Sequence, residues 1–189
     1  MTLIPTSNGV PYLPDGFPLD KPSPSSVWTR ALIFALVFVV LQVMWEWARG
    51  TGIERVVIDT MTVEPAVFLL NLFSPDVHAV ADGTRIRAPG GGINILNGCE
   101  GTEVLFMMIA AFCAVPMVWR RRVQGLVISV GLVYALNQVR ILCLFYAFRG
   151  NKSLFDLLHT VLAPLMLIIF SALFFYAWIH RDLGTTEAA

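Results

Sequence analysis

Four long apolar segments constrain the fold of this chain more than any other feature of its sequence. A helix of about 20 apolar residues crosses the ~30 Å hydrocarbon core of a bilayer, and each segment is close to that length. Trp28 and Trp47 flank the first segment, as aromatic anchors at the two membrane interfaces do. The sequence therefore predicts an all-α polytopic membrane protein with about four transmembrane helices. These cover approximately residues 28–47, 101–119, 123–145 and 157–179.

Composition agrees with a membrane protein and excludes one class of partner. Hydrophobic residues make up 57% of the chain and charged residues only 14%, which is far from the balance of a soluble domain. The formal net charge is zero, so the chain lacks the basic surface that nucleic-acid binding needs. We therefore expect the lipid bilayer as a partner and no nucleic acid.

The cysteines do not suggest a metal site or a disulfide framework. Cys99, Cys113 and Cys143 form no Cys-x-x-Cys pair and have no zinc-ligand spacing with the three histidines. Cys113 and Cys143 lie inside apolar segments, where cysteine packs as a small apolar side chain. We expect no metal and no cofactor, which leaves Cys99 as the candidate for chemistry.

Two tails flank the predicted membrane-embedded domain, which covers residues 27–181. Residues 1–26 contain six prolines among Ser, Gly and Asp, which favours a disordered tail. Residues 182–189 form a short C-terminal tail. We expect both tails in the cytoplasm, because the triple arginine at 120–122 falls in a short turn between the second and third segments, and clustered positive charge favours that side.

The loop at about residues 50–98 then lies on the extracytoplasmic side, and its sequence divides into two parts. Residues 59–73 are apolar, but they are interrupted by a proline and too short to span, so we expect an interfacial or re-entrant helix. From residue 77 to residue 96, apolar and polar residues alternate around Asp82-Gly83. This pattern predicts a small extracytoplasmic β-hairpin.

Three polar residues occur at the same end of three different apolar segments. Cys99 precedes the second segment, Arg140 lies near the end of the third, and His159 opens the fourth. Because successive spans alternate in direction, the three residues share one membrane face, which this orientation makes the extracytoplasmic face of the plasma or inner membrane. A cation within a span is costly unless it faces a polar site. Together these residues offer a nucleophile, a cation and a base, which is the outline of a cysteine peptidase.

Polar neighbours accompany Arg140 and His159. Asn137 lies three residues before Arg140, and Asp156 lies three residues before His159. Residues at this spacing share a helix face, so each candidate has a supporting polar side chain.

The surroundings of Cys99 also suit a nucleophile. Cys99 opens a helix, where the helix dipole and a nearby cation would lower the pKa of the thiol. Glu103 follows one helical turn later. It either pairs with Arg140 or only favours the helix N-terminus, and the sequence leaves both possibilities open.

The short motifs around these residues resemble those of the exosortase and archaeosortase family. They are Asn-Gly-Cys-Glu-Gly at 97–101 and Asn-Gln-Val-Arg at 137–140, followed by the lone His159, and the resemblance covers about residues 40–180. The family consists of polytopic membrane cysteine transpeptidases or peptidases, commonly with eight spans. They process exported proteins that end in a sorting signal made of a short motif, a transmembrane helix and a basic tail.

The resemblance implies a role for each candidate residue. Cys99 would be the nucleophile that forms a thioester with the substrate, Arg140 the conserved cation, and His159 the third catalytic member. Asn97 and Asn137 belong to the motifs and would support them. The thioester would be resolved by water, or by an amine from a lipid or another acceptor, and the sequence does not choose between these outcomes.

Other classes of function remain open. A non-enzymatic membrane assembly factor or small transporter would also contain polar residues within its spans, and it would tolerate Cys99→Ser but not changes at Arg140 or Asn137. A thiol oxidoreductase needs a second cysteine near Cys99, and the other two lie deeper in the spans. A metalloprotease is disfavoured because the sequence has no His-Glu-x-x-His motif.

Overall fold

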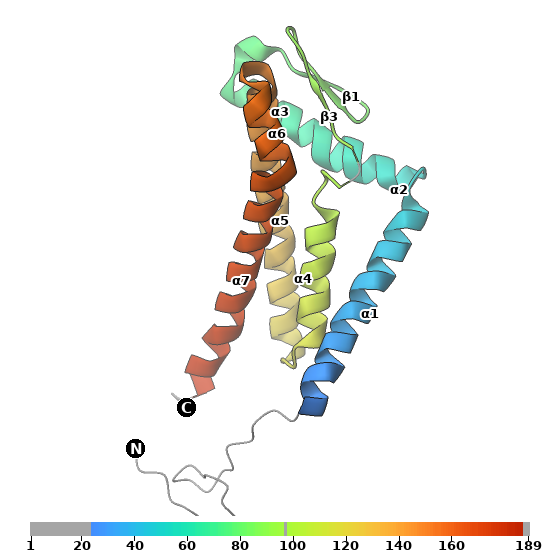
Figure 1. Cartoon of the computed structure of the whole chain (residues 1–189), viewed down its shortest axis with the longest axis vertical. Coiled ribbons are helices and arrows are strands. Elements are labelled where there is room, and N and C mark those ends of the chain that lie inside the picture. Colours follow the sequence, from blue (N-terminus) through green and yellow to red (C-terminus); the bar gives the residue numbers. More distant parts are fainter. Residues whose placement is uncertain (1–23, 97, 187–189) are drawn as a thin grey trace, which may run out of the picture.

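The computed structural model of the chain has two parts, a bundle of upright helices and a cap across one end of it (Figure 1). The structure describes residues 24–96 and 98–186. Most of the predicted N-terminal tail, and Asn97, therefore lie outside the described residues. Helix α1 begins at Pro24, inside the predicted tail, and helix α7 continues to Thr186, inside the predicted C-terminal tail.

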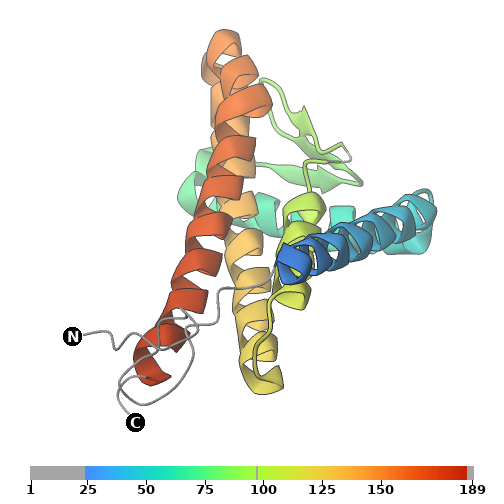
Figure 2. The same ribbon diagram turned by 60° about the horizontal axis from the view of Figure 1, so that its bottom comes forward.

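The bundle consists of four helices, of which α4, α5 and α7 lie side by side, while α1 packs against α4 and is inclined away from the others (Figures 1 and 2). Its members are α1 (Pro24–Ala48), α4 (Thr102–Ala114), α5 (Trp119–Gly150) and α7 (Ala163–Thr186). Within the described residues, four helical stretches are long and apolar enough to cross a membrane, which confirms the predicted class. They are Ser26–Ala48, Gly52–Phe73, Trp119–Gly150 and Lys152–His180.

Helix α4 is shorter than the predicted second span. It has 13 residues, or about 20 Å, and ends at Ala114 instead of continuing to residue 119. The cause is Pro116, because a residue that precedes proline avoids the helical conformation, and Val115 is indeed extended with φ −91° and ψ 131°. An extended segment then leads to α5.

The position of the triple arginine also differs from the prediction. Residues 120–122 lie in the first turn of α5 and not in a connecting turn, because α5 begins at Trp119. The helix has 32 residues and is about 48 Å long. This length exceeds the hydrocarbon core of a bilayer, so the last turns of α5 extend into the cap.

A continuous helical rod forms the base of the cap. It is built from α2 (Gly52–Arg55), the π-helical segment η1 (Val56–Val63) and α3 (Glu64–Phe73). The rod lies across the end of the bundle (Figure 1), as the predicted interfacial helix would. It begins earlier than residue 59, and its 22 residues are long and apolar enough to cross a membrane, so the expectation that this segment is too short to span was wrong. Leu70 is buried against the cap, whereas Phe68 and Leu72 are exposed on the other side. An apolar outer face suits the membrane interface.

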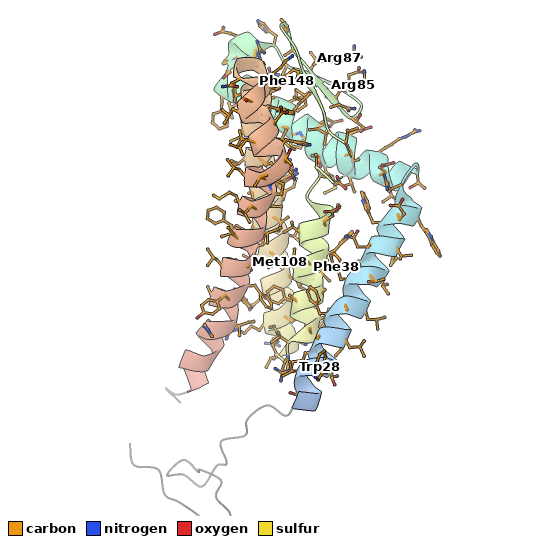
Figure 3. All side chains as sticks on the ribbon, viewed as in Figure 1. Trp28, Phe38, Arg85, Arg87, Met108 and Phe148 are labelled. Atoms are coloured by element: carbon orange, nitrogen blue, oxygen red, sulfur yellow. The ribbon has the colours of Figure 1, made fainter. Side chains whose placement is uncertain are left out.

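A small sheet completes the cap and enlarges the predicted hairpin by one strand. The strands β1 (Val80–Asp82), β2 (Arg85–Arg87) and β3 (Ile93–Asn94) are antiparallel in the order β1-β2-β3. Ile86 points into the cap, and its neighbours Arg85 and Arg87 point away from it. Figure 3 shows these arginines at the cap end of the molecule and Trp28 at the opposite end of α1.

Three short helical segments connect these elements. The 3₁₀ turn η2 (Pro75–Val77) joins the rod to the sheet. After α5, the chain forms α6 (Lys152–Leu157) and the π-helical segment η3 (Leu158–Leu162), which lead directly into α7. This stretch places the start of the last predicted span at the cap end (Figure 1).

The cap and the bundle have separate apolar cores. In the bundle, the helices approach closely because Gly125 has no side chain: a Cβ there would lie 2.4 Å from the Phe112 ring. The bundle core consists of Val104, Met108, Phe112, Val133 and Leu167. The cap core consists of Ile58, Val63, Ala66, Leu70, Ala79, Ile86, Ile93, Ile95, Ile141, Leu144 and Phe145.

Candidate active site

Cys99 and Arg140 are in contact at the junction between cap and bundle. The Arg140 Nη2 group donates to the Cys99 Sγ atom at 3.8 Å, across 41 residues of sequence. Arg140 projects from α5 and is only 8% exposed. Cys99 lies in a turn in which its N–H donates to the Leu96 carbonyl at 3.0 Å. The structure therefore brings together two of the three residues singled out from the sequence.

Gly101 explains how the segment that carries Cys99 can lie against α5. Its φ is +83°, a conformation that residues with a side chain rarely adopt. A Cβ at this position would also lie 3.2 Å from the Asn137 Cγ atom. Asn137 and Arg140 are nearly one turn apart on α5, so they contact the segment at Gly101 and at Cys99 respectively.

Buried polar side chains surround this contact. Asn137 and Gln138 are 2% and 4% exposed, and Glu100 and Thr102 are also buried. The Thr102 hydroxyl donates to Glu100 Oε1 at 2.9 Å. Among the described residues, Glu100 Oε2, Asn137 Oδ1 and Arg140 Nε have no hydrogen-bond partner. Buried polar atoms usually have partners, so this cluster is poised to bind a further polar group.

Glu100 and Gln138 belong to the two sequence motifs, and Glu100, like Glu103, was a possible partner of Arg140. Thr102 was not in the predicted site, although it lies only three residues after Cys99. Thr62 gave no such signal. Its carbonyl accepts a hydrogen bond from Gln138 Nε2 at 3.4 Å, although 76 residues separate the two in sequence.

His159 lies at the same end of the molecule but does not contact Cys99. It is exposed in η3, and its ring stacks on Phe155 with centroids 5.5 Å apart and an interplanar angle of 4°. Among the described residues, none forms a hydrogen bond with the imidazole, Asp156 included. A π-helical turn is rare and frequently marks a functional site. The sequence did not predict this turn.

Glu103 lies in the first turn of α4 and is exposed. In the part of the chain that the structure describes, it forms no ion pair with Arg140. Of the two possibilities left open by the sequence, the position at the helix N-terminus is the one the structure shows.

The electrostatics of Cys99 differ from the expectation of a lowered pKa. Burial raises the pKa of the thiol above the ordinary value of 9.0, and the negative charges of Glu100 and Glu103 raise it further. The Arg140 cation and the hydrogen bond at Leu96 act in the opposite direction without overcoming these effects. The resting thiol is therefore protonated at neutral pH, and a nucleophilic Cys99 needs a base.

One hollow borders the cluster, and a second lies beside the segment that precedes Cys99. An apolar cavity of about 200 Å³ lies between α5, η3 and α7, and Arg140 forms part of its wall beside Leu158. A larger polar cleft of about 590 Å³ lies between residues 49–59 and the sheet, and it includes Leu96. Among the described residues, no group of three or more His, Cys, Asp or Glu side chains is placed to hold a metal ion.

The fold and the site define a multi-pass membrane protein with a partly buried cysteine–arginine pair at one end of its helices. Residues 26–176 match the family model described as transmembrane exosortase (Exosortase_EpsH), and the chain belongs to this family. No curated protein and no solved structure matches the chain. Family membership gives the chain a general role as a membrane transpeptidase or protease.

Proposed function

We propose that this protein is a membrane cysteine peptidase or transpeptidase that cleaves the C-terminal sorting signal of exported proteins. The contact between Arg140 and Cys99 at 3.8 Å is the observation that supports it best. A buried cation beside a thiol suits a reaction in which sulfur and then oxygen carry negative charge. In this proposal, the site faces the extracytoplasmic side of the plasma or inner membrane, where exported substrates are anchored.

The reaction begins with the removal of the thiol proton. His159 takes the proton from Cys99 Sγ, which is necessary because burial keeps the thiol protonated. The imidazole has no hydrogen bond to the described residues, so turning toward the junction when substrate binds would break only its stacking on Phe155. Catalytic hydrogen bonds often form only in the substrate complex.

The thiolate then attacks the carbonyl carbon of the scissile peptide bond. Arg140 donates to the oxyanion that forms, a contribution of about 3–4 kcal/mol for one donor of this kind. The C–N bond breaks as His159 returns the proton to the leaving amine. The membrane-anchored tail leaves with the new amine, and the remaining substrate is held as a thioester on Cys99.

A second reaction releases the product. Attack by water on the thioester gives a carboxylate and makes the enzyme a protease. Attack by an amine from a lipid or another acceptor gives an amide and makes it a transpeptidase. In both cases the thiol regains its proton, and His159 again acts as the base.

Processing of a reporter in cells tests this function. The protein is co-expressed with a secreted reporter that ends in a candidate sorting signal from the same genome, and the mass of the reporter is measured. We expect the wild-type protein to remove the tail and Cys99→Ala to leave it intact. Cys113→Ala is the matched control, because Cys113 lies in the last turn of α4, at the end of that helix away from Cys99, and it should process normally.

The same experiment can contradict the proposal. Equal processing by wild type and Cys99→Ala would show that Cys99 is not the nucleophile. If neither protein processes the reporter although both are folded in the membrane, a non-enzymatic assembly factor becomes the better account. The mass of the new C-terminus separates hydrolysis from transfer.

A further inference from the structure

The polar cleft beside the sheet has no role in the reaction above. Its volume of about 590 Å³ is within the range of ~300–1,000 Å³ that is typical of ligand sites. One wall comes from the α1–α2 junction and η1, and the other from the sheet. On this second side the lining residues are Gly83 and Thr84, which form the turn between β1 and β2, and Ile95 and Leu96, which follow β3.

The sheet has an unpaired edge at β3, and the two residues that continue this edge beyond the strand, Ile95 and Leu96, line the cleft. Strand β3 is the last strand in the order β1-β2-β3. The Ile95 N–H donates to the Thr84 carbonyl at 2.8 Å, so Ile95 faces β2. Along a strand, the N–H and C=O groups of successive residues point alternately toward one neighbouring strand and away from it. The N–H and C=O groups of Asn94 and the N–H group of Leu96 therefore face away from β2. Among the described residues, the N–H groups of Asn94 and Leu96 have no acceptor.

This edge ends close to the candidate nucleophile. The hydrogen bond from Cys99 N–H to the Leu96 carbonyl, at 3.0 Å, closes a four-residue turn. The ends of such a turn lie within about 7 Å of each other. An extended peptide covers about 3.3 Å per residue, so the distance from Leu96 to Cys99 corresponds to about two residues of a peptide bound beside Leu96.

We propose that an extended segment of the substrate binds in this cleft and pairs with the free edge of β3 as an added strand. This inference rests on the proposed peptidase function and identifies the binding site for its substrate. Added strands are held by main-chain hydrogen bonds, and alternate side chains supply the specificity. The pairing fixes the register of the peptide and thereby places one carbonyl at Cys99.

The charged residues of the cleft indicate which side chains are available to the substrate. Arg49 is paired with Glu46 at 2.6 Å. Glu54 accepts a hydrogen bond from the Gly50 N–H at 2.6 Å. Among the described residues, Arg55 and Asp59 have no ion-pair partner, so they present one positive and one negative charge to the bound peptide. A peptide with polar side chains of both kinds, or with small uncharged ones, fits this wall.

Two substitutions of Leu96 separate the backbone from the side chain. Leu96→Pro removes the N–H that faces the cleft but keeps the carbonyl that accepts from Cys99. Leu96→Ala keeps both groups and removes only the side chain. We expect Leu96→Pro to lower the rate of reporter processing about fivefold to tenfold, as the loss of one backbone hydrogen bond does, and Leu96→Ala to lower it less, by about twofold. Equal effects of the two substitutions would contradict strand addition.

Photo-crosslinking tests the same proposal without activity. In Cys99→Ala protein, the photoreactive residue p-benzoylphenylalanine replaces Leu96 or, as a control, Val80. The two side chains are equally exposed, at 62% and 61%, but Val80 lies on β1 at the opposite edge of the sheet. We expect the reporter to be captured from position 96 and not from position 80.

The outcomes distinguish this inference from the proposed function. Processing that depends on Cys99, combined with no capture at position 96 and with full activity of Leu96→Pro, overturns the cleft as the substrate site and leaves the peptidase function intact. Processing that does not depend on Cys99 overturns both proposals. Capture at both positions also contradicts the inference, because it shows contact without selection of one edge.

Discussion

The cap and the bundle place their apolar side chains differently. In the cap, 11 apolar residues are buried in one core, whereas the bundle core has 5 although its helices are longer. In the most apolar stretch of α1 no residue is buried inside the protein. In the most apolar stretch of Lys152–His180, only 11% of the residues are buried. Large side chains of the bundle, such as Leu36 and Leu173, face outward.

The difference shows that the two regions are built for different surroundings, the cap for water and the bundle for lipid. The cap buries apolar surface against itself, and its charged residues, such as Arg85 and Arg87, face outward, as in a water-soluble domain (Figure 3). The bundle leaves its apolar surface for lipid, where helices associate through close packing at small residues such as Gly125. Cys99 and Arg140 lie where the two regions meet.

The largest expected effect is on a leucine in the cap core. Leu70 is fully buried in α3, so Leu70→Ala removes buried methyl groups and leaves a cavity. We expect it to lower the free energy of unfolding by about 2–5 kcal/mol, measured by thermal unfolding of the purified protein in detergent micelles. A change of less than 1 kcal/mol would mean that the cap is not packed like a soluble core.

The second effect compares a glycine at the junction with a glycine in the bundle. In Gly101→Ala, a residue with a side chain must adopt a left-handed backbone conformation, and its Cβ approaches Asn137. The substitution should cost about 1–2 kcal/mol and displace Cys99 from Arg140. Gly131→Ala is the matched control, because a Cβ there would meet no atom within 4 Å. We expect lost processing for the first variant and wild-type processing for the second. Equal activity of both variants would show that the close approach at Gly101 is not needed.

A smaller effect concerns the charges that the junction places around the thiol. In a Cys113→Ala/Cys143→Ala background, Cys99 is the only thiol, and its alkylation rate can be followed against pH. The rate should rise with pH and reach half of its maximum above 9.0, because only the thiolate reacts and burial raises the thiol pKa.

Two substitutions test the direction in which each neighbouring charge shifts the pH profile of Cys99 alkylation. Glu100→Gln removes a negative charge that raises the pKa of Cys99, so the alkylation profile should move to lower pH. Arg140→Gln removes the cation that stabilises the thiolate, so the profile should move to higher pH. Shifts in the opposite directions would contradict the placement of these charges next to the thiol.

The smallest expected effect is on a leucine that faces lipid. Leu36 is 62% exposed on α1, so Leu36→Ala exchanges one lipid contact for another. We expect the free energy of unfolding to change by no more than about 0.5 kcal/mol, in the same assay used for Leu70→Ala. A large loss would indicate that this face of α1 packs against protein in the membrane.

Much of the fold could be predicted from local patterns. The apolar segments predict a membrane protein, and the alternation around Asp82-Gly83 predicts the hairpin. Both predictions succeed because hydropathy and strand periodicity are properties of neighbouring residues. The early end of α4 at Ala114 is less visible, because Pro116 lies inside the apolar segment 101–119. The effect of this proline on the helix end is nevertheless local. The third strand, by contrast, depends on pairing across the sheet.

The candidate site was only partly visible in the sequence. The order of the spans was sufficient to place Cys99, Arg140 and His159 at one end of the molecule. It did not show that His159 stacks on Phe155 in a π-helical turn, because a π-helical turn leaves no clear periodic pattern. It also did not show that the thiol pKa is raised, because that depends on burial.

The sequence alone determined that this protein spans a membrane and that a cysteine, an arginine and a histidine lie at a common end. Solvation and helix direction decide these features, and both depend on short stretches of chain. Only the tertiary structure decided that Arg140 contacts Cys99, that Gln138 reaches Thr62, and that the residues after β3 line a cleft. These contacts join residues far apart in sequence, and they depend on how side chains of different elements pack together.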